Sequence, residues 1–264
     1  MKLPRPLFVL TAAAVALTAA AAALPPAGRL VAWLVVGAGT TAVWVRAVTT
    51  LRSRLLGFAW TEAPAPTREV ALTYDDGPDP AATPALLDLL RERGVRATFF
   101  LVGARARAHP DLVRRIVAEG HLVGNHSDRH SPATNLWFSA RLRRDLAACQ
   151  QTLTELTGAA PVYFRPPVGL ANHATHPVAA ALGLQVVGWR VRGLDTPRRP
   201  PGAVIRAILA RVGGGDVVLL HDGGRAPDSV RAITVGVLDG LAERGLTPVR
   251  LDRLLGRDAG EPGG

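Results

Sequence analysis

Between residues 68 and 255 the chain alternates short runs of β-branched and aromatic residues with longer segments of helical periodicity. This alternation restricts the possible folds most strongly, because strands separated by helices form a mainly parallel sheet. The predicted strands are 70–74, 97–102, 122–124, 162–164, 186–189, 217–220 and 247–250. The predicted helices are 84–93, 110–119, 140–156, 177–182, 203–212 and 230–244. The fold class is therefore α/β.

The number of strand–helix units favours a barrel over an open sheet. About seven units in this span predict a distorted (β/α) barrel, because a full eight-unit barrel usually needs about 250 residues. The alternative is an open, doubly wound sheet. That fold places a glycine-rich phosphate loop after its first strand, whereas this chain has Asp75-Asp76-Gly77-Pro78 there. A nucleotide-binding fold is disfavoured.

Two apolar stretches, residues 7–24 and 30–45, precede this region. The first contains no charged residue, and the second lies between Arg29 and Arg46 with Trp33 and Trp44 near its ends. Their lengths approach the ~20 residues of a membrane-spanning helix, and tryptophans are common at membrane interfaces. We therefore expect two N-terminal membrane helices.

Other interpretations of the N-terminal region stay open. Residues 7–24 could be a cleaved signal peptide, with small residues at Ala21 to Ala23 as the cleavage site. Two buried helices of a soluble protein fit less well, because the first stretch is apolar on every face. The predicted division of the chain is a membrane region at 1–60, a Pro/Ala linker at 61–67, a globular domain at 68–255 and a flexible tail at 256–264.

The net charge of +10 is concentrated around the apolar stretches. Residues 1–61 contain six basic residues and no acidic one, a distribution expected of membrane-flanking segments. Aromatic residues make up only 5% of the chain, and no basic patch interleaved with aromatics is present. We therefore predict contact with a lipid bilayer and none with nucleic acid. Basic residues flank both ends of the helix pair, and this distribution would place both ends in the cytoplasm. A domain that acts outside the cytoplasm needs the opposite placement, so the side of the membrane stays unresolved.

Ionisable residues follow several of the predicted strands, where parallel α/β folds place their chemistry. Asp75 and Asp76 end the first strand, and His126 and His130 follow the third. Two histidines four residues apart share one face of a helical turn and can bind one metal ion. Together with Asp76 they form a candidate Asp–His–His metal site with positions left for water.

Three later strand ends carry further candidate residues. Arg165 follows the fourth strand and can hold a carboxylate through two hydrogen bonds. Trp189 and Asp195 follow the fifth strand, and His221 ends the apolar run 217–220. An ordinary turn or a core residue would explain such residues at any one strand end. It does not explain them at all five strand ends together.

These residues occur in motifs that resemble those of the polysaccharide deacetylase family, the NodB-homology domain of carbohydrate esterase family 4. The matching segments, all within 68–255, are 73–78 (TYDDGP), 126–130 (HSDRH), 165–169 (RPPVG), a Trp/Asp segment and 219–222 (LLHD). The fourth departs from the family pattern, because the family usually has Asp-Trp where this chain has Asp195-Thr196. The lining of the sugar pocket is therefore expected to differ.

The resemblance implies a distorted (β/α) barrel and metal-dependent removal of N-acetyl groups from amino sugars. Its implied metal ligands are Asp76, His126 and His130, with zinc as the expected divalent ion. The remaining roles that it implies are Asp75 as general base, His221 as general acid, Arg165 orienting Asp75, Asp195 pairing with His221, the Val168 N–H holding the oxyanion, and Leu219 and Trp189 lining the acetyl pocket.

The predicted function is a membrane-tethered, metal-dependent hydrolase that deacetylates a glycan similar to chitooligosaccharide or peptidoglycan. No obligate protein partner is implied. A substrate in the cell wall requires the domain to lie outside the cytoplasm. Two alternatives stay open: hydrolysis of a non-sugar amide on the same metal site, and a non-catalytic glycan-binding protein. The second would be expected to lack a ligand or the base, and all of these residues are present.

Overall fold

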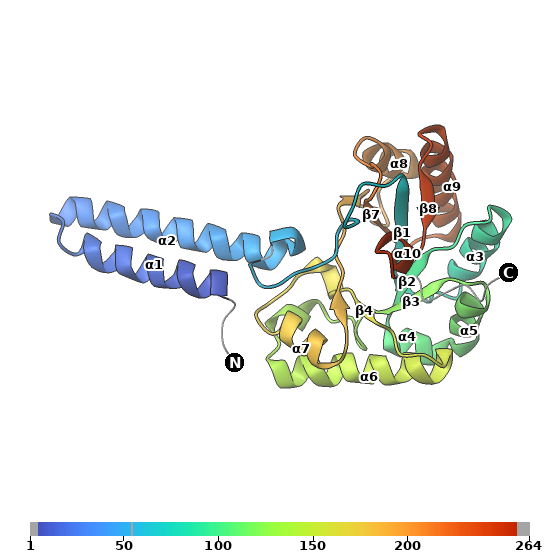
Figure 1. Ribbon diagram of the computed structural model, residues 1–264, viewed down its shortest axis with the longest axis horizontal. Coiled ribbons are helices and arrows are strands. Elements are labelled where there is room, and N and C mark those ends of the chain that lie inside the picture. The colour runs from blue at the N-terminus through green and yellow to red at the C-terminus, as the bar shows by residue number, and fades with distance from the viewer. Residues whose placement is uncertain (1–4, 54, 258–264) are drawn as a thin grey trace.

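The computed structural model describes residues 5–53 and 55–257 (Figure 1). Its strands are β1 (Glu69–Gly77), β2 (Thr98–Leu101), β3 (Leu122–Asn125), β4 (Tyr163–Phe164), β5 (Gln185–Val186), β6 (Val191–Arg192), β7 (Val217–His221) and β8 (Thr247–Val249). They form one sheet in the order β5-β4-β3-β2-β1-β7-β6, and β8 pairs with the start of β1. Every ladder between these strands is parallel. The sheet curls into an incomplete barrel, which confirms the predicted fold class.

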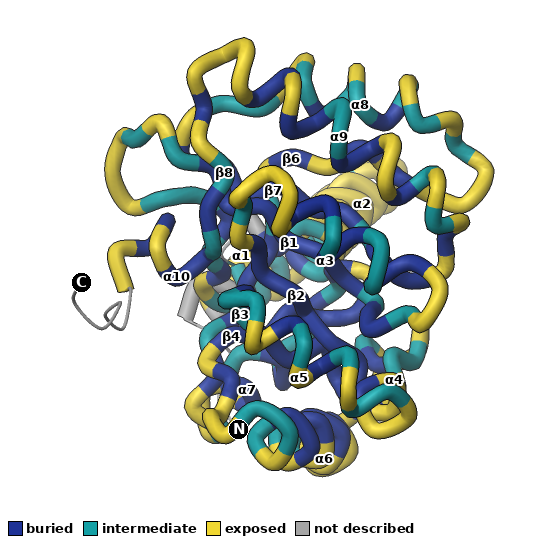
Figure 2. Tube along the Cα trace, turned by 90° about the vertical axis from the view of Figure 1, so that its right-hand side faces the viewer, coloured by how far each residue is buried: buried dark blue, intermediate teal, exposed yellow. Residues whose placement is uncertain are grey.

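Helices surround this sheet. They are α3 (Thr83–Glu92), α4 (Gly103–Ala108), α5 (Pro110–Ala118), α6 (Ser139–Thr157), α7 (Thr175–Ala181), α8 (Pro201–Leu209), α9 (Pro227–Glu243) and the short α10 (Leu251–Leu254). Figure 2 shows the strands buried at the centre and the helices exposed on their outer sides. The amphipathic helices therefore cover one face of the sheet and leave the other face to line the barrel.

The two-residue period of β1 divides its side chains between these two faces. Val70, Leu72 and Tyr74 pack in the core between sheet and helices. Ala71 belongs to a second cluster inside the barrel, to which α10 contributes Leu251 and Leu254. Asp75 lies in register with the inward-facing set, and this position directs its carboxylate into the barrel.

Among the described α-helices and strands, three short elements were not predicted from the sequence. They are β6, of two residues, α4, with the sequence GARARA, and α10, of four residues. The segment 126–130, expected to form a helical turn, is instead an irregular loop in which Ser127 and His130 have left-handed φ values of 68° and 46°. That expectation was wrong because hydrogen bonds from the loop to neighbouring segments take the place of helical ones: Ser127 O accepts from Gly103 N–H, and His126 N–H donates to Leu101 O.

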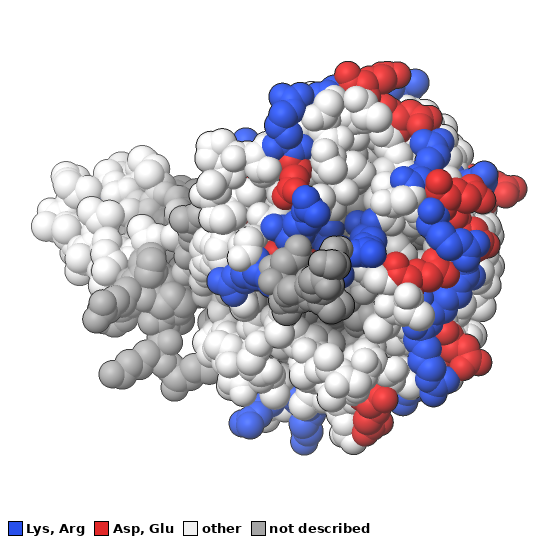
Figure 3. All heavy atoms as spheres, turned by 45° about the vertical axis from the view of Figure 1, so that its right-hand side comes forward, with Lys and Arg blue, Asp and Glu red and all other residues white. Residues whose placement is uncertain are grey.

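The N-terminal helices α1 (Arg5–Ala21) and α2 (Pro26–Thr49) form an antiparallel hairpin that projects from the barrel (Figure 1). Most of their apolar side chains from Val9 to Val45 are exposed, and the Trp33 indole N–H donates to Thr18 O to link the two helices. In Figure 3 the visible surface of the hairpin carries no charge, unlike that of the barrel. α2 is long and apolar enough to cross a membrane, and α1 is a shorter apolar helix. An exposed apolar hairpin does not fit the interpretation of two helices buried in a soluble protein.

The hairpin joins the barrel through an ordered segment. Ala47, Leu51 and Leu56 pack in a cluster with residues of α6 and α7. Trp60 then pairs with Val187 beyond β5, and Glu62 pairs with Asp216 before β7. Chain contacts with the barrel therefore begin before the predicted linker at 61–67. The predicted flexible tail at 256–264 lies outside the described residues from 258 onward, as do the flanking charges Lys2 and Arg54.

Candidate active site

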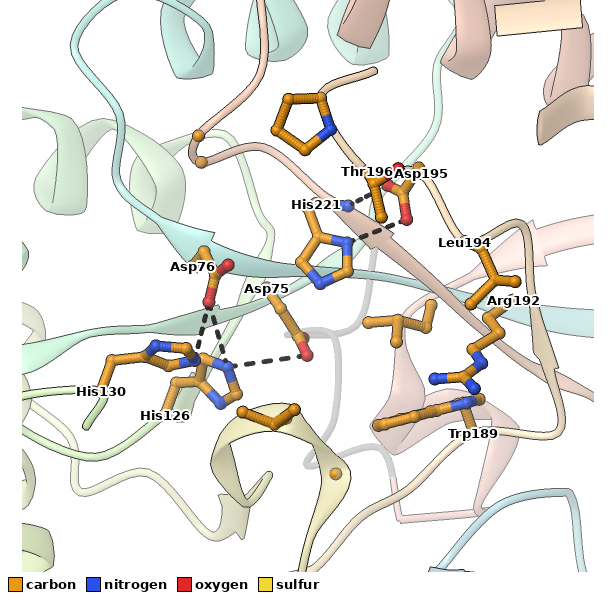
Figure 4. A pocket seen from close by; sticks show the side chains of 16 residues that line it. Asp75, Asp76, His126, His130, Trp189, Arg192, Leu194, Asp195, Thr196 and His221 are labelled. Carbon is orange, nitrogen blue, oxygen red and sulfur yellow. Dashed lines mark hydrogen bonds and ion pairs between the residues drawn. The ribbon is translucent and has the colours of Figure 1, made fainter. Parts of the chain in front are cut away.

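A pocket of about 450 Å³ opens at the carboxyl ends of β1, β6 and β7 (Figure 4). It contains nine of the ten predicted site residues, and the tenth, Arg165, is fully buried against one of them. The lining residues are Asp75, Asp76, His126, His130, Val168, Gly169, Trp189, Arg192, Leu194, Asp195, Thr196, Pro197, Leu219, His221, Gly223 and Gly224. Residues up to 149 positions apart in the sequence thus share one cavity.

Asp75 and Asp76 point in different directions although they are adjacent in the chain. Asp75 is 3% exposed and lies inside the barrel. At Asp76 the backbone turns to a left-handed φ of 73°, where the register between β1 and β2 shifts. The turn directs the Asp76 carboxylate to His126 and His130, so the two carboxylates have separate surroundings (Figure 4).

Asp76, His126 and His130 form a cluster that could hold a metal ion. Asp76 Oδ1 lies 3.0 Å from His130 Nε2 and 3.4 Å from His126 Nε2, and one candidate ligand atom of each residue lies within 4.8 Å of the others. His126 Nδ1 is 2.7 Å from Arg165 O. Because a carbonyl can only accept, Nδ1 carries the proton and Nε2 presents a lone pair to the cluster.

The protonation states of this cluster fit a cation. Asp76 Oδ1 is buried and has no hydrogen-bond partner among the described residues. Burial opposes its ionisation, but His126 and His130 outweigh this effect and hold the pKa of Asp76 below its ordinary range. Burial, followed by the nearby His126, lowers the pKa of His130. A divalent metal requires an ionised carboxylate and neutral imidazoles as ligands, and the pKa directions of Asp76 and His130 favour these forms.

Arg165, which follows β4, connects Asp75 to β2 and to the segment after β5. Its side chain is 0% exposed and donates from Nη1 to Asp75 Oδ1 (2.7 Å) and Thr73 Oγ1 (2.8 Å), and from Nη2 to Gly188 O (2.9 Å). The guanidinium carbon lies 4.2 Å from the centroid of the Phe100 ring. This network fixes the orientation of the Asp75 carboxylate and leaves its Oδ2 toward His126 (3.8 Å).

His221 lies beside Asp75 on the neighbouring strand β7, where the two residues are partners in register. Asp195 Oδ2 accepts from His221 N–H at 2.8 Å, and Oδ1 lies 2.9 Å from His221 Nδ1. Burial lowers the pKa of His221, but the hydrogen bond to Asp195 and the charges of Asp195, Asp75 and Asp76 more than offset this and raise it to about 9. His221 is therefore protonated at neutral pH in this arrangement.

The remaining predicted residues form the pocket wall. Leu219 is buried at its base, Val168 is exposed to it, and Trp189 packs so closely on Gly169 that a Cβ there would lie 2.0 Å from the indole. Val168 has a left-handed φ of 59°, a genuine outlier for a β-branched residue. Within the described part of the chain its N–H donates no hydrogen bond. An oxyanion in the pocket could therefore accept from it.

Three residues that the motifs did not single out also build the site. Arg192 and Leu194 line the pocket, and Arg105 of α4 donates from Nη1 to Asp76 O. Arg105 and Arg192 carry no sequence signal, because the first lies on an unpredicted helix and the second on an unpredicted strand. The left-handed Leu194 (φ 51°) carries no sequence signal for its conformation either.

The comparison with known proteins agrees with this geometry. The model of the polysaccharide deacetylase family matches residues 62–187. A peptidoglycan-N-acetylglucosamine deacetylase of Bacillus cereus is 34% identical over 201 residues, which cover 75% of this chain and 93% of that protein. The chain belongs to the polysaccharide deacetylase family. It is accordingly an enzyme, a hydrolase that acts on carbon–nitrogen bonds other than peptide bonds.

Two further members of the family are similar over most of the barrel. A chitooligosaccharide deacetylase of Sinorhizobium fredii is 39% identical over 154 residues, 58% of this chain and 72% of that protein. The crystal structure of a peptidoglycan N-acetylglucosamine deacetylase superposes with a TM-score of 0.71 and 30% identity, covering 83% of this chain and 98% of that chain. The incomplete barrel is thus the fold of this deacetylase family.

The Arg165–Asp75 pair gives a prediction about stability. Arg165→Met leaves the Asp75 carboxylate buried without its partner, and we expect it to lower the free energy of unfolding by about 3–5 kcal/mol. The double variant Arg165→Met/Asp75→Leu removes both charges and should be more stable than the single variant. Denaturant unfolding of the detergent-solubilised chain, followed by circular dichroism, measures both effects. A double variant no more stable than Arg165→Met would contradict a charge-pair origin.

Proposed function

We propose that this enzyme removes acetyl groups from N-acetylated amino sugars of a cell-wall glycan. The observation that carries the proposal is the convergence of a base, an acid and a metal-ligand cluster on one pocket. Asp75 and His221 lie on neighbouring strands, and the Asp76–His126–His130 cluster lies beside Asp75 (Figure 4). A metal-dependent hydrolysis of an amide uses these three kinds of group around one carbonyl.

Asp76, His126 and His130 would hold a divalent metal. Two imidazole nitrogens and one carboxylate oxygen suit zinc, with further positions left for water and substrate. When bound, zinc would supply Lewis-acid polarisation of the acetyl carbonyl and would acidify water. The Arg165 carbonyl, which accepts from His126 Nδ1–H, keeps the second nitrogen of that ring free to serve as a ligand.

Asp75 would act as the general base. Its Oδ1 is held by Arg165, so that Oδ2 remains free to accept the proton of an attacking water molecule. The fixed carboxylate needs no reorientation when the water attacks, which is the advantage of a positioned base. Asp75 lies between the cluster and His221, within reach of a carbonyl carbon placed in the pocket.

His221 would act as the general acid. An amine leaves only when its nitrogen is protonated, so the acid must carry a proton at the moment the C–N bond breaks. Asp195 accepts from Nδ1, fixes the ring and favours the imidazolium, whose Nε2–H then faces the pocket. The N–H of Val168 would stabilise the tetrahedral oxyanion, and Leu219 and Trp189 would enclose the acetyl methyl group.

The two relatives suggest the class of substrate. One is named for peptidoglycan N-acetylglucosamine and the other for chitooligosaccharide, and both present an acetamide on a glucosamine ring. We propose the same acetamide for this enzyme, in an acetylated glycan. The completeness of the site argues against a non-catalytic glycan-binding protein. Hydrolysis of a non-sugar amide stays the alternative, since the site describes the reaction centre rather than the ring.

We further propose that α1 and α2 (within residues 1–60) tether the domain to a membrane, that 61–67 links the two parts and that the catalytic domain spans 68–255. At 1.5 Å per residue the 24 residues of α2 extend about 36 Å, enough to cross the ~30 Å apolar core of a bilayer. α1, with 17 residues, is at the lower limit. A cell-wall substrate places the catalytic domain outside the cytoplasm.

Metal dependence and the role of Asp75 can be tested together. We expect a chelator to abolish acetate release from chitooligosaccharides and zinc to restore it. His126→Ala should lose bound metal and activity together. Asp75→Asn should keep the metal and lower kcat by about 100-fold or more, because it removes only the base. Elemental analysis of the purified variants and an acetate assay measure the two quantities.

His109→Asn is the matched control, because His109 begins α5 outside the pocket. It should retain both metal and activity. Turnover that resists chelation would reject the metal assignment, and an Asp75→Asn variant with full activity would reject the base.

The pH profile tests the acid. Asp195→Asn removes the charge that raises the pKa of His221, so we expect that pKa to fall by about one unit or more. A general acid is lost as the pH rises through its pKa. The alkaline limb of kcat/KM should therefore move to lower pH in the variant. The leaving group of 4-nitrophenyl acetate needs no proton, so Asp195→Asn should lower kcat/KM for this ester much less than for the glycan substrate. Equal losses of kcat/KM on the two substrates would argue against the acid role.

Protease accessibility tests the orientation of the domain. The flanking charges alone favour a cytoplasmic location for both ends of the hairpin, whereas a wall substrate demands the opposite. In intact spheroplasts we expect added protease to digest the catalytic domain while a cytoplasmic marker survives. Protection of the domain until the membrane is permeabilised would instead point to an acetylated precursor made inside the cell.

A further inference from the structure

Arg192 is a cationic side chain in the pocket to which the mechanism gives no role. It is the one arginine or lysine among the described residues that line the pocket, and it lies on β6 at the side of Trp189 and Leu194 (Figure 4). Its guanidinium carbon is 5.7 Å from the centroid of the Trp189 ring. In the part of the chain that the structure describes, no ion pair or hydrogen bond engages this guanidinium.

Neighbouring arginines differ in this respect. Arg190, two residues earlier, pairs with Glu62 and Asp216. Arg225, behind the pocket wall, donates to the carbonyls of Thr196 and Arg199. Arg165 pairs with Asp75. A guanidinium stacked near an indole keeps the N–H groups at its edge open, and that edge matches a carboxylate or phosphate through two parallel hydrogen bonds.

The acidic side chains and Arg192 lie at opposite ends of the pocket. Asp75 and Asp76 lie with the histidine cluster, and Asp195 is engaged by His221. Arg192 lies at the opposite end, over the Trp189 ring (Figure 4). An acetamide bound between the cluster and His221 would therefore extend toward Arg192 with its neighbouring groups.

We propose that Arg192 forms an anion subsite that binds an oxyanion on the sugar adjacent to the one being deacetylated. This inference rests on the proposed deacetylase function and specifies its substrate class: an acidic glycan rather than a neutral one. The shared chemistry is an oxyanion that accepts two hydrogen bonds from the guanidinium edge, and we take a carboxylate on the adjacent sugar as its source. A sugar phosphate is the other source, which the experiment distinguishes.

Four matched substrates test the subsite. The first is the disaccharide of N-acetylglucosamine and N-acetylmuramic acid, which carries a carboxylate, and the second is the same disaccharide with that group converted to a carboxamide. The third is the neutral N-acetylglucosamine dimer, and the fourth is its 1-phosphate. We expect kcat/KM for the acid to exceed that for the amide by about tenfold, the size of one charged hydrogen-bonding contact, mainly through KM.

Arg192→Gln should reduce this acid-to-amide ratio to near one. Arg192→Lys should keep only part of it, because an ammonium lacks the planar edge. The matched control is Arg231→Gln, which removes the same charge from the exposed face of α9 and should leave the ratio unchanged. Comparable melting temperatures would show that the variants are folded.

The outcomes separate this inference from the proposed function. Equal kcat/KM values for acid and amide in the unmodified enzyme, or a preference that survives in Arg192→Gln, would overturn the anion subsite and leave the deacetylase intact. A preference for the phosphate alone would overturn the carboxylate as the source. An enzyme that deacetylates none of the four substrates would overturn the proposed function and the subsite with it.

Discussion

The buried ion pair between Arg165 and Asp75 is the interaction on which the site depends. A guanidinium without contact with water is tolerated only when a carboxylate and further acceptors surround it. Here Asp75, Thr73 and the Gly188 carbonyl supply these acceptors from β1 and from the segment after β5. The Arg165 carbonyl also accepts from His126. One residue therefore orients the base through its side chain and a metal-ligand candidate through its backbone.

Backbone strain is concentrated at the same place. Five described residues other than glycine have left-handed φ values: Asp76, Ser127, His130, Val168 and Leu194. Four of them line the pocket, and the fifth follows His126. Such conformations cost about 1–3 kcal/mol each and persist only where the surroundings determine them. At Asp76 the left-handed turn separates two adjacent carboxylates, which lets one face the cluster and the other the barrel interior. The barrel thus maintains a geometry that the local sequence disfavours.

The sequence predicted best those elements that depend on the local pattern of apolar and polar residues. Seven strands were predicted because each is an apolar run between helical segments, and the strand-end residues followed from that order. The path of the chain between His126 and His130 was not predictable, because two left-handed residues and contacts with α4 replace the expected helical turn. Arg192 was missed for a related reason. Its strand is two residues long, and its lack of an ion-pair partner among residues 5–53 and 55–257 is a property of the assembled pocket.

The strands of the barrel hold the base and the acid, whereas a loop forms the opposite wall of the pocket. Asp75 and His221 are register partners on β1 and β7, so their separation is set by backbone hydrogen bonds of the sheet. Residues 192–197 form the opposite wall and lie mostly on a loop, whose fixed point inside the pocket is Asp195. Apart from Asp195, which holds His221, the residues of this loop touch neither the base nor the cluster, so we expect their substitution to change what the pocket recognises without moving those groups. Thr196 stands where the family usually has tryptophan, so recognition of the substrate by this wall depends on its other side chains, and the positive charge among these is on Arg192.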